Sequence, residues 1–151
     1  MREHVGLFRG KRLDSGEWVE GYLSKRPSAI QIGDYCPWYI SVPPLDPDDN
    51  GGYYNVDPDS IGECTTLKDK NGKLIFEGDI VKSVFNQRPY LVCFGEYTYC
   101  DEYGDELSAC GFYSKDACAS ATDFGSTEEW AIVIGNIHDN PELLEGEREK
   151  K

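Results

Sequence analysis

Apolar residues in this chain alternate with polar ones in short runs, and sequences rich in Gly, Asn and Asp separate the runs. Residues 7–23 predict a β-hairpin, because two such runs flank Asp14-Ser15-Gly16. Residues 67–82 predict a second hairpin, in which Asn71-Gly72 supplies the positive φ angles of a tight turn. Its returning arm is interrupted by Glu77-Gly78-Asp79. The pattern therefore indicates a chain built from antiparallel hairpins.

Further strands are expected where β-branched and aromatic residues gather between turn residues. These strands are residues 29–32, 38–42, 53–56, 90–94 and the apolar run 130–134. Asp57 is expected to cap a short helical turn, with Pro58 in its first position. Asn140-Pro141 predicts the start of a short C-terminal helix for the same reason.

The fold class predicted from this pattern is mainly β, with a small barrel or a partly open antiparallel sheet. An SH3-like barrel is one form of it. A single domain over residues 1–151 is expected, with a core from 7–42, 53–94 and 130–145 and an aromatic-rich excursion at 95–129. The strand at 130–134 is expected to complete a sheet that contains both hairpins. The predicted core residues are Phe8, Val19, Leu23, Ile75, Ile80, Val81, Val92, Phe94, Ile132 and Ile134.

The net charge of −13 is unevenly distributed. Residues 34–66 carry seven acidic and no basic side chains, and residues 96–130 carry nine acidic and one basic. A general duplex-DNA binder is not expected, because it would need a wide basic surface. The acidic stretches have two interpretations: solubility of flexible loops, or an acidic face for a basic partner.

Membrane association is not expected, since no apolar run approaches the roughly 18 residues of a membrane span. No signal peptide is visible, and the expected compartment is the cytosol. Thiols remain reduced there, so the six cysteines are expected to be free and mostly buried. A disulfide or a metal site is the alternative, although the closest pair, Cys93 and Cys100, is spaced too widely for the usual zinc pattern.

Two groups of residues are candidate binding sites. Arg9, Lys11 and Arg12, with Trp18 and Tyr22 nearby, could bind an anion or a nucleic-acid strand, or could balance acidic segments. Glu77 and Asp79 flank a glycine that would let a ligand or metal approach. The alternative is a bulge or a close strand crossing at Gly78, with the two carboxylates paired to nearby lysines.

No catalytic residue, metal site or cofactor is expected. The two histidines lack triad partners, and the phosphate-loop, nucleophile-elbow and zinc-protease motifs are all missing. The acidic run 46–51 resembles a calcium loop, but Asp57 stands where a bidentate Glu is usual.

The stretch Leu67–Lys82, LKDKNGKLIFEGDIVK, closely resembles the signature of the YopX-like family of phage and prophage proteins. The resemblance extends to Phe8–Lys11, Gly16–Val19 and Ile134–Ile137, and to Asn140–Leu143. Family members carry Gly where this chain has Thr66, and an aromatic residue in place of Cys64. Thr66 cannot adopt a Gly-type conformation cheaply. The resemblance implies a mostly β protein of phage or prophage origin, and it transfers no catalytic residue.

The expected function is therefore that of a non-enzymatic accessory protein that acts through protein–protein contacts in the bacterial host cytoplasm. A host or phage protein is the expected partner, and a homo-oligomer is expected from the exposed aromatic residues. Single-strand binding is the first alternative, and nucleic acid is a less favoured partner. The residues expected to bind the strand are nearby aromatic residues and Arg9, Lys11, Arg12, Lys25 and Arg26. A metal-dependent enzyme that uses the Asp-rich loop, or Glu77 and Asp79, is the second.

Overall fold

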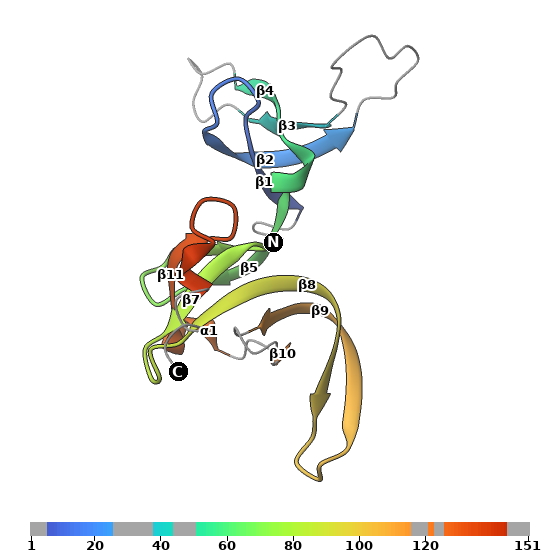
Figure 1. Ribbon diagram of the computed structural model, residues 1–151. Coiled ribbons are helices and arrows are strands. Elements are labelled where there is room, and N and C mark those ends of the chain that lie inside the picture. Colours follow the sequence, from blue (N-terminus) through green and yellow to red (C-terminus); the bar gives the residue numbers. More distant parts are fainter. Residues whose placement is uncertain (1–5, 26–37, 44–50, 116–120, 123–125, 145–151) are drawn as a thin grey trace. The chain divides into compact units, whose positions relative to one another are not determined.

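The computed structural model describes residues 6–25, 38–43, 51–115, 121–122 and 126–144. The chain divides into two compact units, Met1–Cys64 and Thr65–Lys151. Each unit is built on antiparallel strands whose order runs from one edge to another, so the sheets are open (Figure 1). The prediction of a mainly β fold with partly open sheets is confirmed, and the described residues form no closed SH3-like barrel.

The first unit contains an antiparallel sheet in the order β4-β3-β2-β1-β5. Its strands are β1 (Leu7–Lys11), β2 (Trp18–Lys25), β3 (Trp38–Val42), β4 (Gly52–Asn55) and the beginning of β5 (Gly62–Lys68). The hairpin predicted for residues 7–23 is confirmed, because β1 pairs with β2 from Leu7–Tyr22 to Lys11–Trp18. The strands predicted at 38–42 and 53–56 are also present, whereas 29–32 lies outside the described residues.

One face of this sheet carries the core of the first unit. Ile40 and Val56 are fully buried there. A Cβ atom added at Gly10 would lie 3.0 Å from the Val56 Cβ, so the chain after β4 packs directly on β1. Val56 leads into a 3₁₀ turn, η1 (Pro58–Ser60), and the Asp57 carboxylate accepts a hydrogen bond from Asp59 N at 3.0 Å. The predicted cap is confirmed.

The second unit holds a five-stranded sheet in the order β10-β9-β8-β7-β11, and a short strand, β6, hydrogen-bonded to β5. Its core is formed by Ile75, Val81, Val92 and Ala131. The elements are β6 (Leu74–Phe76), β7 (Asp79–Ser83), β8 (Pro89–Cys100), β9 (Glu106–Lys115), β10 (Ala121–Thr122), α1 (Thr127–Trp130) and β11 (Ala131–Asn136). Residues 142–144 are helical, as the Asn140-Pro141 pattern predicts.

β1 and β2 of the first predicted hairpin and β5 and β6 of the second lie in one six-stranded sheet, whereas β11 pairs with β7 in the five-stranded sheet. The prediction of one sheet containing both hairpins is therefore confirmed for these four strands, and the prediction that the strand at 130–134 completes that sheet is wrong. The core prediction is correct for Ile75, Ile80, Val81 and Val92, while Phe8, Val19, Leu23 and Ile132 are only partly buried.

Two predicted core residues are exposed. Ile134 is 39% exposed, because a register shift between Val133 and Gly135 leaves it as the extra residue of a bulge. Phe94 is 51% exposed, because β8 continues past its pairing with β7, which ends at Leu91.

The signature turn at residues 69–73 depends on a single left-handed residue. Gly72 has φ +83°, whereas Asn71 has a negative φ, so the prediction of two positive φ angles is wrong. The Asp69 carboxylate instead organises the turn: its Oδ1 accepts from Asn71 N and Lys73 N, both at 2.9 Å. Thr66 has φ +67°, so the chain keeps a Gly-type conformation at a β-branched residue despite its cost.

Candidate functional site

The Glu77-Gly78-Asp79 sequence forms the connection between β6 and β7. Asp79 is 1% exposed, and its Oδ2 accepts a hydrogen bond from Phe76 N at 2.8 Å. Gly78 has φ +92°; its N–H donates to Val92 O, and its carbonyl accepts from Ile137 N. Gly78 thus joins three segments of the second unit by backbone hydrogen bonds. This geometry gives Gly78 and Asp79 a structural role. It agrees with the close strand crossing at Gly78 that the sequence predicted as the alternative to a ligand site.

The basic cluster predicted from the sequence is brought together around Trp18. The Arg9 guanidinium carbon lies 4.7 Å from the centre of the Trp18 ring, and the Lys11 ammonium lies 5.6 Å from it. This arrangement follows from the β1–β2 register, in which Lys11 is opposite Trp18 and Arg9 is opposite Glu20. Both cations therefore lie on one face of the sheet, over an aromatic ring that attracts positive charge.

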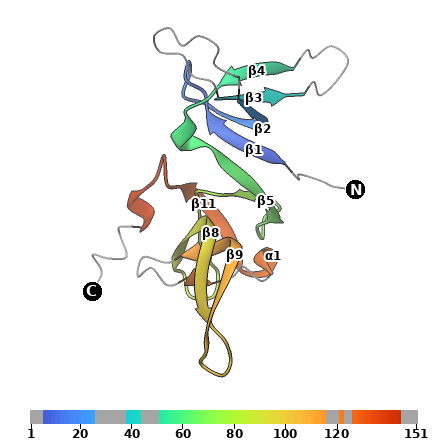
Figure 2. The ribbon, with the colours of Figure 1, turned by 90° about the vertical axis from the view of Figure 1, so that its right-hand side faces the viewer.

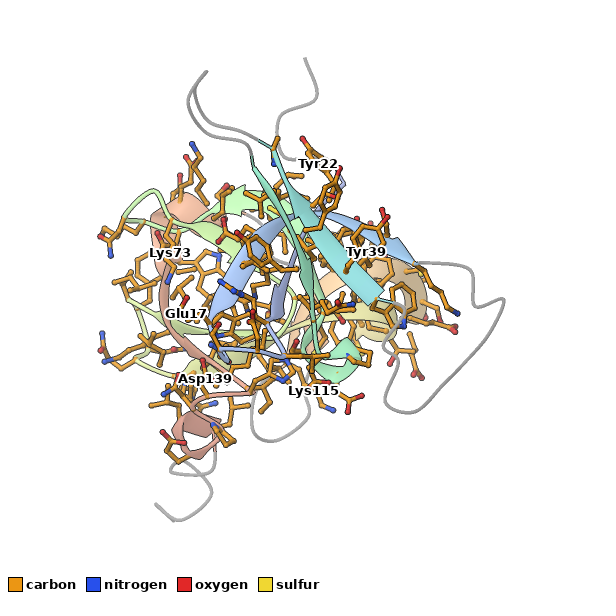
Figure 3. The ribbon with its side chains drawn as sticks, turned by 90° about the horizontal axis from the view of Figure 1, so that it is seen from above. Glu17, Tyr22, Tyr39, Lys73, Lys115 and Asp139 are labelled. Carbon is orange, nitrogen blue, oxygen red and sulfur yellow. The ribbon has the colours of Figure 1, made fainter. Side chains whose placement is uncertain are left out.

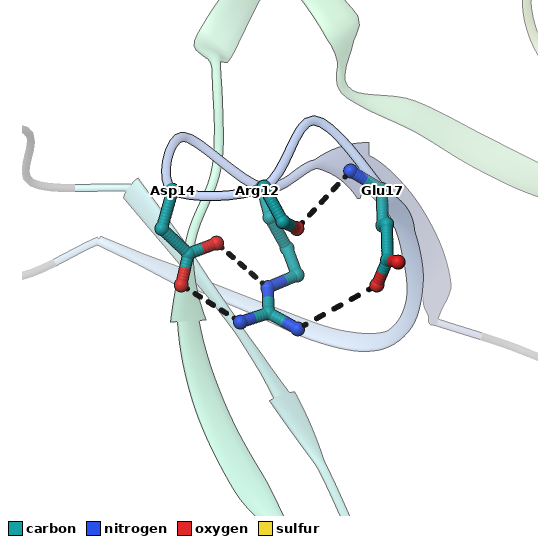
Figure 4. Close-up of polar contacts among 4 residues, drawn as sticks. Arg12, Asp14 and Glu17 are labelled. Carbon is teal, nitrogen blue, oxygen red and sulfur yellow. Dashed lines mark hydrogen bonds and ion pairs between the residues drawn. The ribbon is translucent and has the colours of Figure 1, made fainter.

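Arg12 does not join this cluster and instead pairs with two carboxylates. Its Nε and Nη2 donate to the two carboxylate oxygens of Asp14 at 2.9 and 2.7 Å, and Nη1 lies 3.9 Å from Glu17 (Figure 4). The hydrogen bonds with Arg12 lower the pKa of Asp14, and the same bonds raise the pKa of Arg12. The Arg12 guanidinium also lies 4.3 Å from the centre of the Tyr54 ring. Arg12 thus balances acid in its own turn, the second role considered for this cluster.

Three tyrosines share a face with Trp18, and of these only Tyr22 was predicted from the sequence to lie beside the basic cluster. Tyr22 of β2 is opposite Ser41 of β3, which is opposite Tyr53 of β4. Tyr39 lies on the same face, with its ring centre 6.0 Å from that of Tyr53. Tyr22 and Tyr53 are 53% and 73% exposed. The alternation of residues along each strand was visible in the sequence, but the alignment of three separate strands was not.

The second candidate surface is the long β8–β9 hairpin. The two strands pair continuously from Leu91–Lys115 to Cys100–Glu106, well beyond the pairing of β8 with β7 and of β9 with β10. Both ribbon views show its far end extending away from β7 and β11 (Figures 1 and 2). A hairpin around Asp101–Asp105 was predicted, and it is confirmed as the tip of this ribbon.

One face of the hairpin carries stacked aromatic rings. The Tyr97 and Tyr113 ring centres are 4.8 Å apart, and Tyr97 and Tyr99 are 6.0 Å apart. Gly95 is directly opposite Gly111, so neither strand carries a side chain at this pair of positions. Residues 89–114 include five acidic side chains and no basic one: Glu96, Asp101, Glu102, Asp105 and Glu106. The hairpin is therefore both aromatic and strongly negative.

The four described cysteines are free, as expected. Cys64 is buried and Cys93 is partly buried, but Cys100 and Cys110 are exposed on the hairpin, so the prediction of mostly buried thiols is wrong for these two. Burial raises the pKa of Cys93, and a hydrogen bond with Tyr113 partly offsets this rise. Burial and the nearby Cys93 also raise the pKa of Tyr113. Cys36 and Cys118 lie outside the described residues.

Metal-binding geometry is not found in the part of the chain that the structure describes, where no three His, Cys, Asp or Glu side chains come together. The Asp46–Asn50 segment of the calcium-like loop lies outside that part, as does His4. No helix among the described residues is long and apolar enough to cross a membrane.

Comparison with known proteins places the chain in a family. A search of the curated proteins found no match. The family model described as YopX protein matches residues 7–145 and so includes both units, the signature turn and the C-terminal Asn140–Leu143 segment. The chain therefore belongs to the YopX family.

Proposed function

We propose that this protein is a non-enzymatic phage or prophage accessory protein, and that it acts by binding a host or phage protein through the β8–β9 hairpin. The observation that carries the proposal is the free length of this ribbon. Beyond Leu91 and Ser114, neither strand has a further strand beside it among the described residues. A two-stranded ribbon is only marginally stable alone in water, and a partner would stabilise it.

The side chains on the hairpin favour a protein partner with a basic surface. Tyr99 and Leu107 form a cross-strand pair and are 39% and 42% exposed. Exposed apolar groups that lie together often mark protein contacts. The five acidic side chains listed for residues 89–114 would attract a basic surface and accelerate its association. A second copy of the hairpin carries the same negative charge, so two hairpins would repel each other in direct contact.

The test compares two cross-strand pairs that are neighbours on opposite faces. In the first variant Tyr99→Ser is combined with Leu107→Ser, and in the control Thr98→Ala is combined with Ser108→Ala. Each protein is used to capture partners from lysate of the bacterial host. A protein retained by the wild type and the control, but lost from the Tyr99 and Leu107 variant, supports the proposal. Capture that is unaffected by this variant, or no specific capture, contradicts it.

Native mass spectrometry of gently purified protein tests whether the protein forms a homo-oligomer and whether it carries a metal. We propose a homo-oligomer that forms through a surface other than the hairpin and binds no metal. A stoichiometric metal would instead favour a metal-dependent enzyme. In that case divalent cations should raise the melting temperature. A monomeric mass at micromolar concentration contradicts the homo-oligomer.

A further inference from the structure

We propose that the first unit binds single-stranded nucleic acid on the sheet face that carries Arg9, Lys11, Trp18, Tyr22, Tyr39 and Tyr53. This surface is called the aromatic face below. It is separate from the β8–β9 hairpin, and the proposal does not depend on the protein-binding function. The ligand class follows from the combination of aromatic rings with a small number of cations on adjacent strands.

The strand register spreads the aromatic rings across three strands. Trp18 and Tyr22 are on β2, and Tyr39 and Tyr53 follow on β3 and β4. Residues on one face of a strand repeat about every 6.7 Å, and neighbouring strands lie about 4.8 Å apart. The rings are therefore spaced on the scale of successive bases in an extended strand. Figure 3 shows Tyr22 and Tyr39 on the first unit.

The opposite face of the same sheet is the core face, where Ile40 and Val56 are buried. The aromatic face therefore does not supply the core of this unit, and its exposed tyrosines need another explanation. Tyr53 is 73% exposed and Tyr22 is 53% exposed. Tyrosine rings in such positions offer flat surfaces on which unpaired bases of any sequence can stack.

The charge on the aromatic face sets a modest affinity. Arg9 and Lys11 contribute two positive charges beside Trp18, while Glu20 opposite Arg9 contributes one negative charge. Arg9 is only 8% exposed, so Lys11 supplies the phosphate contact. One phosphate contact gives a slope of about −0.7 for log K against log salt concentration with a single strand, and raising the salt from about 50 to about 200 mM should then weaken binding roughly 2.6-fold. A duplex would bind worse, because its bases are stacked inside and cannot reach the tyrosines.

The experiment measures fluorescence anisotropy of a labelled oligothymidylate of about 15 nucleotides, with the full-length protein over a range of salt concentrations. Lys11→Ala should reduce the magnitude of the slope by about 0.7. Lys25→Ala is the matched control, because Lys25 also lies over a tryptophan, Trp38, at 5.3 Å but on the core-side face. It removes the same charge and should leave the slope unchanged. Equal effects of the two variants would contradict the proposal.

A second pair of variants tests the stacking directly. Tyr22→Ala should weaken binding about tenfold at every salt concentration, because stacking does not depend on ionic strength. Tyr103→Ala, which removes a tyrosine 82% exposed at the hairpin tip, should have no effect. Glu20→Gln should strengthen binding, because it removes the negative charge opposite Arg9. Circular dichroism and melting temperature confirm that each variant folds.

Three results would overturn the proposal. The first is no change in anisotropy with wild-type protein at low salt. The second is displacement of the oligonucleotide by polyglutamate at equal charge, which would indicate an acidic peptide as the ligand. The third is tighter binding of a duplex of the same length than of the single strand.

Discussion

The carboxylate of Asp69 accepts a hydrogen bond from the backbone N–H of Val133 at 2.9 Å, across 64 residues of sequence. Its other oxygen organises the signature turn, and its side chain is almost completely buried. A second bond joins the same segments, from Lys70 N to Ala131 O at 2.8 Å. One aspartate therefore closes the turn and attaches it to β11.

The turn at the tip of the β8–β9 hairpin is organised by an aspartate in the same way, but among the described residues no hydrogen bond joins that aspartate to a distant strand. Asp101 Oδ1 accepts from Tyr103 N and Asp105 N, both at 2.9 Å. Gly104 has φ +83°, the same value as Gly72 in the signature turn. Asp101 is thus a matched control for Asp69 within the same protein.

We expect Asp69→Ala to lower the free energy of unfolding by about 3 kcal/mol, because it leaves the Val133 N–H and two turn N–H groups without their acceptor. Asp101→Ala should cost about 1 kcal/mol or less, since water replaces the lost acceptor at the exposed tip. Urea denaturation of both variants measures the difference. Equal losses would mean that the bond to Val133 contributes nothing.

Replacing Thr66 by glycine should stabilise the protein by about 0.5–1 kcal/mol. Thr66 is β-branched and has φ +67°, a conformation that glycine adopts at little steric cost. The gain is limited because glycine has a larger conformational entropy in the unfolded chain. Thr98→Gly is the control: this exposed strand threonine has a negative φ, so its replacement should destabilise. Thermal melts of the two variants should shift in opposite directions.

Gly135→Ala should lower the free energy of unfolding by about 1–3 kcal/mol, because the added methyl group overpacks the site. A Cβ there would lie 2.5 Å from Asn140 Oδ1 and 2.9 Å from Leu143 Cδ1. Asn140→Ala should partly rescue the Gly135→Ala variant, since it removes the closest atom. A double-mutant cycle with strictly additive losses would show that the two positions do not touch.

The pKa of Asp14 should be lower in the folded protein than that of an ordinary aspartate, because its carboxylate accepts two hydrogen bonds from Arg12. A lowered folded-state pKa means that this pair contributes stability above the unfolded-state pKa, and the contribution disappears as the pH falls through the folded-state value. NMR titration of the side-chain carboxyl carbon should show the low pKa in the wild type. Arg12→Ala should raise it, and an unchanged titration would exclude Arg12 as the cause.

Cys93 should react with iodoacetamide more slowly than Cys100 and Cys110, because it is partly buried and its pKa is raised by burial. Tyr113→Phe should slow Cys93 further, since the hydroxyl hydrogen bond lowers the pKa of the thiol. Mass spectrometry of peptides from samples taken over time gives each rate. Faster alkylation of Cys93 in the Tyr113→Phe variant would contradict this assignment.

Elements that depend on local chemistry were predictable from the sequence. The hairpin at 7–23, the cap at Asp57 and the helical turn after Asn140 each rest on residues within a few positions of one another. The grouping of Arg9, Lys11 and Trp18 was predictable for the same reason, because it depends on one short hairpin. The pattern at Asn140 predicted the helix that follows it but not the partner of its side chain, which accepts a hydrogen bond from Asn136 N at the end of β11.

The sequence by itself determined which segments form strands, where the chain turns and which family it belongs to, because period-two patterns and turn residues act locally. Only the tertiary structure decided which strands pair, since pairing depends on segments far apart in the sequence. It paired β11 with β7, exposed Phe94 and Ile134, buried the Asp69 carboxylate and aligned Tyr22 with Tyr53. Both proposed binding surfaces exist only because separate strands were brought into register.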